Sequence, residues 1–289
     1  MPNALQFLIV DGYAKNSRDE LEAAGMKLAW QLYAELLKAY LPDAGFDVLL
    51  PSDPGSELPT GAALQSYHGV IWTGCNLTIY DTKDKKVARQ ITLAREAYEK
   101  GVPSTGSCWG VQMAAVAAGG EVTPNPKGRE MGIARKIHLT AEGRAHPYYE
   151  GKPSAFDGFI SHVDEVTGVP PGATVLATNN FTGVQALAIK YKQGEFWATQ
   201  YHPEYDLHEM ARLIVAREPK LTKENFFREH AELESLVGHM ERLFADPSRK
   251  DLRWLLGIDD DLLDDRIRQQ EFANWIEKLV LPTAQGAKS

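Results

Sequence analysis

Apolar positions follow two different patterns in the first half of the chain. A compact apolar run at 5–10 suits a strand buried on both faces, and further short strands are predicted at 46–50, 69–73 and 102–105. Longer segments between them carry apolar residues at helical spacing, namely residues 19–41, which Pro42 ends, and residues 84–100. Strands that alternate with helices in this way predict a parallel α/β sheet with crossover helices.

The middle of the chain predicts strands of another type. Short β-branched or aromatic segments are separated by Gly, Pro and Asn turns, and they lie at 132–139, 156–160, 174–178, 185–190 and 195–200. This spacing is typical of strands joined by short turns. We therefore expect an antiparallel or mixed extension of the parallel sheet.

The strand pattern ends at Pro203, and the rest of the chain predicts helices at about 207–217, 222–245 and 265–280. One apolar stripe runs along 222–245, formed by Phe226, Leu233, Leu236, Val237, Met240, Leu243 and Phe244. Such a stripe either packs against the α/β body or docks a partner. The pattern therefore predicts an α/β domain over residues 1–217 and a helical C-terminal extension over residues 218–289.

Charge and composition exclude several classes of protein. The 289 residues include 31 Lys and Arg against 39 Asp and Glu, a net charge of −8, which argues against nucleic acid as the main partner. No apolar run has the length of a membrane span, and the N-terminus shows no signal-peptide pattern. We therefore expect a cytoplasmic chain that does not engage a membrane.

The segment around Cys108 carries the clearest chemical signal. Gly106 and Gly110 flank Ser107-Cys108-Trp109 between a short strand and an alanine-rich helix. This G-x-C-x-G arrangement is the cysteine form of a nucleophile elbow, in which a sharp turn lifts the side chain clear of the sheet. The helix N-terminus favours a thiolate there, and the Trp109 N–H can donate to an oxyanion. The alternative is a buried structural cysteine.

A second signal follows the last predicted strand. His202 comes directly after that strand, Pro203 ends it, and Glu204 lies two residues from the histidine. Carboxyl ends of parallel strands gather at one edge of a sheet, which would bring His202 towards Cys108. A thiol nucleophile in acyl transfer needs such a base, and the base needs an orienting group, for which we take Glu204.

Together these residues resemble the class I, triad-type glutamine amidotransferases over about residues 5–217. Gly106–Gly110 with Gln112 and the HPE at 202–204 carry the resemblance, and within the family the chain is similar to the glutaminase domain of GMP synthases through residues 128–139 and 161–166. The resemblance implies an open, mainly parallel sheet flanked by helices in the flavodoxin-like manner. It also implies that Cys108 attacks the side-chain amide of glutamine to form a γ-glutamyl thioester, with His202 as general acid and base and Glu204 as its partner.

The resemblance further implies an oxyanion hole at Gly74 and Trp109, and contacts with the glutamine from Gln112, Ser161, Val163 and Asp164. Two segments depart from the family pattern. The oxyanion strand ends in TGCN at 73–76 instead of a more open glycine-rich loop, and Val163 stands where the family has glycine. Both departures would narrow or reshape the amide pocket. Cys75 is interpreted as a small buried residue, or as a redox partner of Cys108 in the same pocket.

The sequence favours neither a cofactor nor a metal. It has no G-x-G-x-x-G turn after a strand and no phosphate-binding G-x-x-x-x-G-K-S/T loop. His162, Asp164, His202 and His208 form no compact ligand set. The acidic residues of 259–265 lack the alternating pattern of a calcium loop, and we expect a solvated helix start there.

Three functions follow from these observations. The chain lacks the phosphate loop of the synthetase part of GMP synthases, so we place first a glutaminase that passes ammonia to a separate synthetase or ligase partner. The second is an autonomous hydrolase or transferase that acts on γ-glutamyl amides and releases an amine. The third is a non-catalytic regulatory or binding subunit, against which the retained Cys108, His202 and Glu204 argue.

Overall fold

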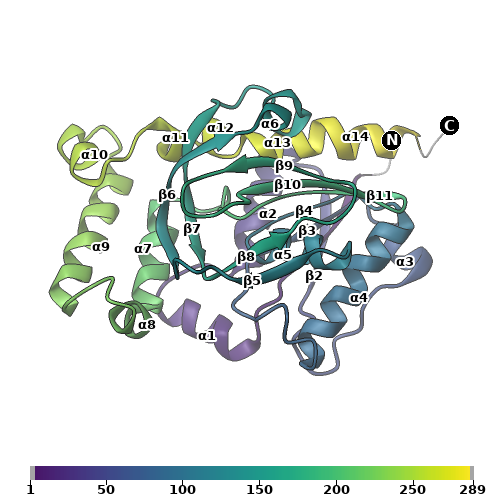
Figure 1. Cartoon of the computed structure of the whole chain (residues 1–289), viewed down its shortest axis with the longest axis horizontal. Helices are drawn as coiled ribbons and strands as arrows, with labels where there is room; N and C mark the ends of the chain where they lie inside the picture. The colour runs from purple at the N-terminus through teal and green to yellow at the C-terminus, as the bar shows by residue number, and fades with distance from the viewer. Residues whose placement is uncertain (1–3, 287–289) are drawn as a thin grey trace.

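A large mixed sheet organises the molecule. The computed structural model describes residues 4–286, and its nine-stranded sheet has the order β2-β1-β3-β4-β11-β10-β9-β6-β7 (Figure 1). Five adjacent strands are parallel: β2 (Gly45–Leu49), β1 (Gln6–Val10), β3 (Gly69–Trp72), β4 (Ser104–Ser107) and β11 (Gly194–Thr199). The predicted parallel sheet is therefore confirmed.

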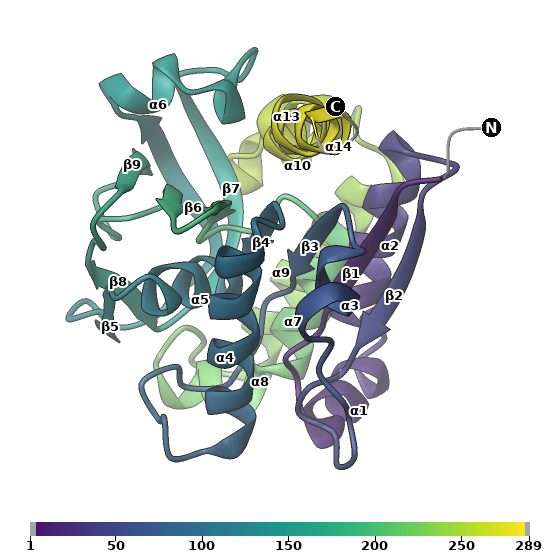
Figure 2. The same cartoon turned by 90° about the vertical axis from the view of Figure 1, so that its right-hand side faces the viewer.

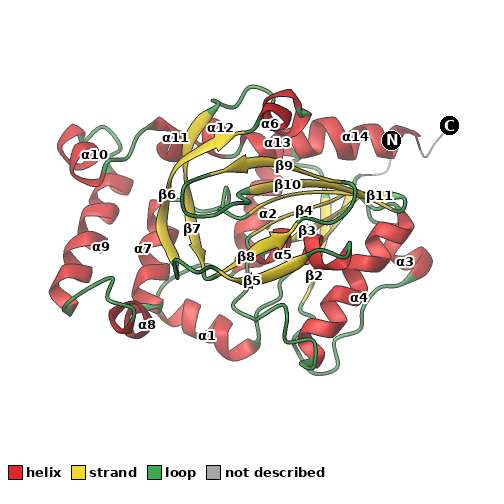
Figure 3. Cartoon of the chain, viewed as in Figure 1, coloured by secondary structure: helices red, strands yellow, loops and turns green. Residues whose placement is uncertain are grey.

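The antiparallel extension is also present. It consists of β10 (Ala186–Tyr191), β9 (Ala173–Thr178), β6 (Glu130–Leu139) and β7 (Ala155–His162). A separate two-stranded sheet pairs β5 (Glu121–Pro124) with β8 (Asp164–Gly168), a strand that the sequence pattern did not predict. Figure 3 shows the strands of the large sheet as a curved, twisted layer with helices around it.

Alternation along β1 explains why both faces of the sheet are covered. Leu8 and Val10 face a cluster that includes α4 (Lys85–Lys100) and α5 (Trp109–Ala117). Phe7 and Ile9 face the other cluster, which contains α2 (Ala29–Tyr40) and α13 (Gln270–Trp275). Successive side chains of a strand point to opposite faces, so a continuous apolar run must be buried on both.

Two predicted helices are each broken into two, and these predictions of continuous helices were wrong. Residues 19–41 form α1 (Lys15–Ala23) and α2, separated by Gly25 with a φ of 82°. Residues 222–245 form α8 (Glu218–Lys223) and α9 (His230–Ala245), separated by a turn in which Asn225 has a φ of 62°. Residues in the left-handed region end a helix, and leucine spacing alone does not reveal them.

The remaining helical elements complete the chain. They are α3 (Gly61–Gln65), α6 (Ala141–Ala145), the short 3₁₀ segment η1 (Pro147–Tyr149), α7 (Leu207–Ala216), α10 (Lys250–Leu256), α11 (Asp260–Leu263), α12 (Asp265–Arg268), the π-helical segment η2 (Ile276–Val280) and α14 (Leu281–Gly286). Figure 2 looks almost along α13 and α14.

The apolar stripe predicted in 222–245 packs mainly against the body. Its buried members are Leu233, Val237, Met240 and Leu243, which join α7 in a third apolar cluster, whereas Phe226 and Phe244 stay exposed. Further along the chain, Trp275 is completely buried against Phe7. How the chain divides into domains, with a boundary at 217, stays a prediction.

The acidic segment 259–265 begins two short helices. Asp259 accepts the Asp260 N–H at the start of α11, and Asp264 accepts the Arg266 N–H at the start of α12. Within residues 4–286, no three His, Cys, Asp or Glu side chains are grouped in a way that could hold a metal ion. No helix of the described chain is both long and apolar enough to cross a membrane.

Candidate active site

Cys108 lies in the turn between β4 and α5, where the sequence predicts an elbow. Its φ of 51° is in the left-handed region, which few non-glycine residues adopt. Its backbone N–H donates to the Thr199 carbonyl of β11 at 2.8 Å. The strained backbone is thus held by the neighbouring strand, a type of strain that is concentrated at functional sites.

The two glycines of the elbow are required by close packing. A Cβ at Gly106 would lie 2.3 Å from the Trp72 carbonyl oxygen, and one at Gly110 would lie 3.1 Å from the same atom. Because Trp72 is on the adjacent strand β3, the elbow can approach β3 closely only when position 106 carries no side chain.

His202 and Glu204 lie just beyond the carboxyl end of β11, which is parallel to β4. The imidazole Nδ1 is 2.7 Å from Glu204 Oε1, and the Ser107 hydroxyl donates to the same oxygen at 2.7 Å. On its other side the imidazole stacks on the Tyr205 ring, with centroids 4.1 Å apart. The structure therefore brings Cys108, His202 and Glu204 to one edge of the sheet.

Electrostatics favour a protonated imidazole at this position. Burial by itself would lower the pKa of His202, but the Glu204 carboxylate and a hydrogen bond with the Cys108 side chain outweigh it and raise the pKa to about 10. A charged imidazole beside a thiol favours the thiolate, which is the nucleophilic form of cysteine.

The two expected oxyanion donors lie beside this group. Gly74 follows β3, and a Cβ placed on it would lie 2.7 Å from His202 Cε1. Any larger residue at this position would therefore clash with the imidazole. Trp109 is the first residue of α5, and its indole N–H is engaged by Gln90 Oε1 at 2.9 Å. Among residues 4–286, neither the Gly74 nor the Trp109 backbone N–H donates to an acceptor.

The residues expected to contact glutamine surround the thiol. Cys108 Sγ is 3.6 Å from the Ser161 carbonyl oxygen, and Gln112 Nε2 donates to the Asp164 carbonyl at 3.0 Å. Val163 joins them in the lining of one pocket. All the predicted site residues therefore meet around Cys108, while the role of each stays a prediction.

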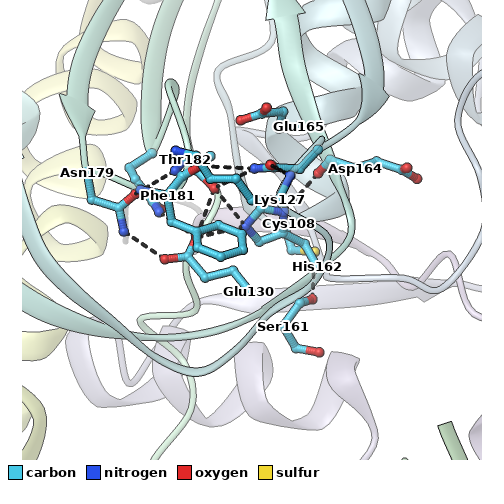
Figure 4. A network of polar contacts seen from close by, with 12 residues as sticks. Cys108, Lys127, Glu130, Ser161, His162, Asp164, Glu165, Asn179, Phe181 and Thr182 are labelled. Atoms are coloured by element: carbon cyan, nitrogen blue, oxygen red, sulfur yellow. Dashed lines mark hydrogen bonds and ion pairs between the residues drawn. The ribbon is translucent and has the colours of Figure 1, made fainter. Parts of the chain in front are cut away.

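A network of polar side chains, mostly buried, is hydrogen-bonded to the turn between β7 and β8 (Figure 4). His162 Nδ1 donates to the Asp164 carbonyl at 2.9 Å, and its Nε2 is 3.1 Å from Glu130 Oε2. Glu130 also accepts hydrogen bonds from Asn179 and Thr182, at 2.7 and 2.9 Å. Burial opposes ionisation of Glu130, but these hydrogen bonds hold its pKa below the ordinary value.

A pocket of about 290 Å³ opens above Cys108. Both cysteines line it, but Cys75 is half-buried instead of buried as expected, and its Sγ accepts the Leu77 N–H at 3.4 Å. Burial raises the pKa of the Cys75 thiol, which keeps it protonated. Both thiols are free, so the structure contains no disulfide between them.

Sequence reasoning missed several polar residues of the pocket, namely Tyr13, Arg129, Tyr205, Arg217 and Lys220. Tyr13 and Tyr205 follow β1 and β11, so the rule that strand ends gather could have found them. Arg129 lies in the segment 128–139, whose sequence indicated only the similarity to GMP synthases. Lys220 belongs to α8, beyond the boundary placed at 217, and nothing in its sequence context indicates a site.

Comparison with known proteins shows the family of this chain. The family model described as glutamine amidotransferase class-I matches residues 57–219. A γ-glutamyl-L-1-hydroxyisopropylamide hydrolase from a Pseudomonas species is 35% identical over 289 residues, which covers 97% of this chain and 95% of that protein. The chain belongs to the class-I glutamine amidotransferase family.

The similarity to a GMP synthase covers a smaller part of both chains, whereas a solved structure shares the fold over almost its whole length. A glutamine-hydrolysing GMP synthase from Nitrosomonas eutropha is 36% identical over 140 residues, 47% of this chain and 25% of that protein. A glutamine amidotransferase from Thermotoga maritima shares the fold, with a TM-score of 0.68 at 19% identity over 96% of this chain and 99% of the other. The predicted fold class, including the C-terminal helices, is therefore confirmed.

Proposed function

We propose that this class-I amidotransferase relative is a γ-glutamyl amide hydrolase that works without a synthetase. One observation carries the proposal: the similarity to a γ-glutamyl amide hydrolase spans the whole chain, including its C-terminal helices, whereas the similarity to a GMP synthase spans half of it. This reverses the order that the sequence suggested. Two free thiols fit a reducing compartment, and we place the enzyme in the cytoplasm.

The proposed reaction begins with acylation of Cys108. Its thiolate attacks the γ-carbonyl carbon of the substrate, and the resulting oxyanion accepts hydrogen bonds from the Gly74 and Trp109 N–H groups. The protonated His202 then gives its proton to the amide nitrogen as the C–N bond breaks, so that the amine leaves and a γ-glutamyl thioester remains.

Deacylation uses the same groups in reverse. Neutral His202 takes a proton from a water molecule, whose oxygen attacks the thioester carbonyl. The C–S bond breaks, glutamate leaves and the thiolate returns beside a protonated imidazole. Glu204, held by Ser107, orients His202 throughout because it engages Nδ1 and leaves Nε2 for the reaction. Gln112, Ser161, Val163 and Asp164 would hold the glutamyl group, and no cofactor is needed.

Intact-protein mass spectrometry tests this function. The protein should form a thioester on Cys108 with γ-glutamyl-n-propylamide and release propylamine without any added protein. His202→Asn should slow amine release strongly, because acylation lacks its acid and deacylation lacks its base, and Cys108→Ala should form no adduct. If no γ-glutamyl compound gives an adduct, ammonia or an amine, a non-catalytic binding subunit becomes the better description.

A second candidate function is a glutaminase subunit that supplies ammonia to a synthetase or ligase. The partial similarity to glutamine-hydrolysing GMP synthases favours it. It predicts ammonia release from glutamine that rises strongly when a synthetase is added, and little hydrolysis of alkylamides. Alkylamide hydrolysis by the isolated chain would argue for the first function.

A further inference from the structure

Part of the pocket lining is left unused by the proposed glutamyl contacts. Once Gln112, Ser161, Val163 and Asp164 are assigned to the glutamyl group, the polar side chains that remain beside Cys108 and His202 include Tyr13, Tyr205 and Arg217. Ammonia as a leaving group needs no binding site for a substituent. We therefore infer that these polar side chains bind a substituent that the substrate carries on its amide nitrogen.

The two tyrosine hydroxyls are available as hydrogen-bond donors. Tyr13 is 6% exposed and Tyr205 is 2% exposed, and neither hydroxyl forms a hydrogen bond within residues 4–286. Burial raises the pKa of both hydroxyls, so they stay protonated. Cys108 and Arg217 line the same pocket and both act electrostatically on Tyr13 and Tyr205, so the nucleophile and a cation share the pocket with the two hydroxyls.

The same lining is rich in positive charge. Within the described residues, the only ion pair of the Arg217 guanidinium is with Glu20, at 3.5 Å, and Lys220 forms none. The third cation of the lining, Arg129, is already held by Glu224 at 2.5 Å. Among the residues that the structure describes, Asp164 is the single carboxylate of the lining, although the chain as a whole has a net charge of −8. The pocket therefore concentrates cations where the protein is otherwise acidic.

We propose that the leaving amine of the preferred substrate carries a carboxylate, which Arg217 and the hydroxyls of Tyr13 and Tyr205 bind. The inference rests on the proposed hydrolase function and narrows its substrate to γ-glutamyl amides of short amino acids. Leu213 lines the same pocket, and a volume of about 290 Å³ leaves room for only a short carbon linker between nitrogen and carboxylate. Hydrolysis would release glutamate and an amino acid.

The cations have one competing use, which is to bind the α-carboxylate of the glutamyl group. That use predicts that loss of Arg217 weakens every γ-glutamyl substrate to the same degree. A contact with the amine side instead predicts that the loss falls mainly on substrates that carry the second carboxylate. The two uses are separated by comparing substrates of equal length with and without that charge.

Steady-state kinetics with three compounds provide the test: glutamine, γ-glutamyl-n-propylamide and γ-glutamyl-β-alanine. The wild-type kcat/KM for the β-alanine amide should exceed that for the propylamide by about tenfold or more, as expected of one charge-assisted hydrogen bond. KM for the β-alanine amide alone should rise with ionic strength. Arg217→Met and Tyr205→Phe should each reduce the preference, mainly through KM, and Arg242→Met on the exposed side of α9 serves as the control.

Two results would overturn the inference while leaving the proposed function intact. The first is equal kcat/KM for the β-alanine amide and the propylamide in the wild-type protein. The second is an equal loss on all three compounds in Arg217→Met, which would assign the arginine to the α-carboxylate. Failure to hydrolyse any of the three would instead overturn the proposed function and, with it, the substrate class.

Discussion

Asp11 shows how far one buried residue can depart from its ordinary chemistry. It follows β1 directly and is completely buried, with one carboxylate oxygen accepting the Tyr13 N–H at 3.0 Å and the other without a partner in the described chain. Burial raises its pKa from 3.8 to about 6, although Arg18 partly opposes the shift. The ionised carboxylate therefore lowers the free energy of unfolding. It lies next to the pocket residue Tyr13, whose N–H it accepts.

We predict that Asp11→Asn stabilises the protein in a pH-dependent way. Since folding favours the protonated form, the wild type loses stability as pH rises from about 4 to above 6, and the asparagine variant does not. The gain at pH 8 should approach about 3 kcal/mol, from a net shift of about two pKa units, which already includes the Arg18 attraction, at about 1.36 kcal/mol each. Urea unfolding at pH 4.5 and pH 8 measures it.

The matched control for this change is Asp43→Asn, because Asp43 is exposed. Its free energy of unfolding should stay within about 0.5 kcal/mol of the wild type at both pH values. Equal destabilisation by Asp11→Asn at both pH values would show that the carboxylate makes a contact the folded state needs.

At the scale of elements, α13 acts as a cover for the parallel sheet. Trp275 is completely buried, with its ring centroid 6.0 Å from that of Phe7 and 5.6 Å from that of Phe272. A Cβ at Gly69 of β3 would lie 2.8 Å from the indole ring. The helix therefore packs directly on β1 and β3, the strands that lead to the pocket.

Trp275→Ala should lower the free energy of unfolding by about 3–5 kcal/mol, since a large buried side chain is removed and leaves a cavity. Trp254→Ala is the matched control, because Trp254 is 87% exposed, and its effect should stay near zero. Chemical denaturation of both variants provides the comparison. Similar small effects of the two changes would mean that α13 is dispensable for the stability of the sheet.

At the scale of the whole molecule, the C-terminal residues serve both packing and the pocket. Phe272, Trp275 and Val280 cover one face of the sheet, and Lys220 lines the pocket. Another contact is buried: Lys152 and Glu271 form an ion pair at 2.6 Å with almost no exposure. The predicted boundary at 217 would therefore separate residues that the fold places in contact.

A chain ended after Arg217 should fail to fold cooperatively, because Phe7 and the other apolar side chains on that face would meet water. A chain ended after Val280 is the control, since α14 contains no buried residue, and it should keep its Tm within a few degrees. Thermal unfolding followed by circular dichroism decides the matter. A soluble, cooperatively folding fragment of residues 1–217 would instead support the predicted division into two domains.

Sequence alone determined the strands of the nine-stranded sheet, the elbow at Cys108 and the position of His202 and Glu204 near that elbow. These features depend on local chemistry, namely apolar runs, glycines at a tight turn and residues directly after a strand. The sequence did not predict the interruptions of two helices, because the left-handed backbone conformation of a residue such as Asn225 depends on its tertiary surroundings.

Only the tertiary structure decided what surrounds the thiol and what covers the sheet. Tyr13 lies far from Arg217 and Lys220 in the sequence, and the three line one pocket only because α7 and α8 fold back beside the end of β1. Trp275 likewise packs on Phe7, although most of the chain separates the two residues in the sequence. Periodicity reveals that a helix has an apolar face, but shape and packing determine where that face is buried.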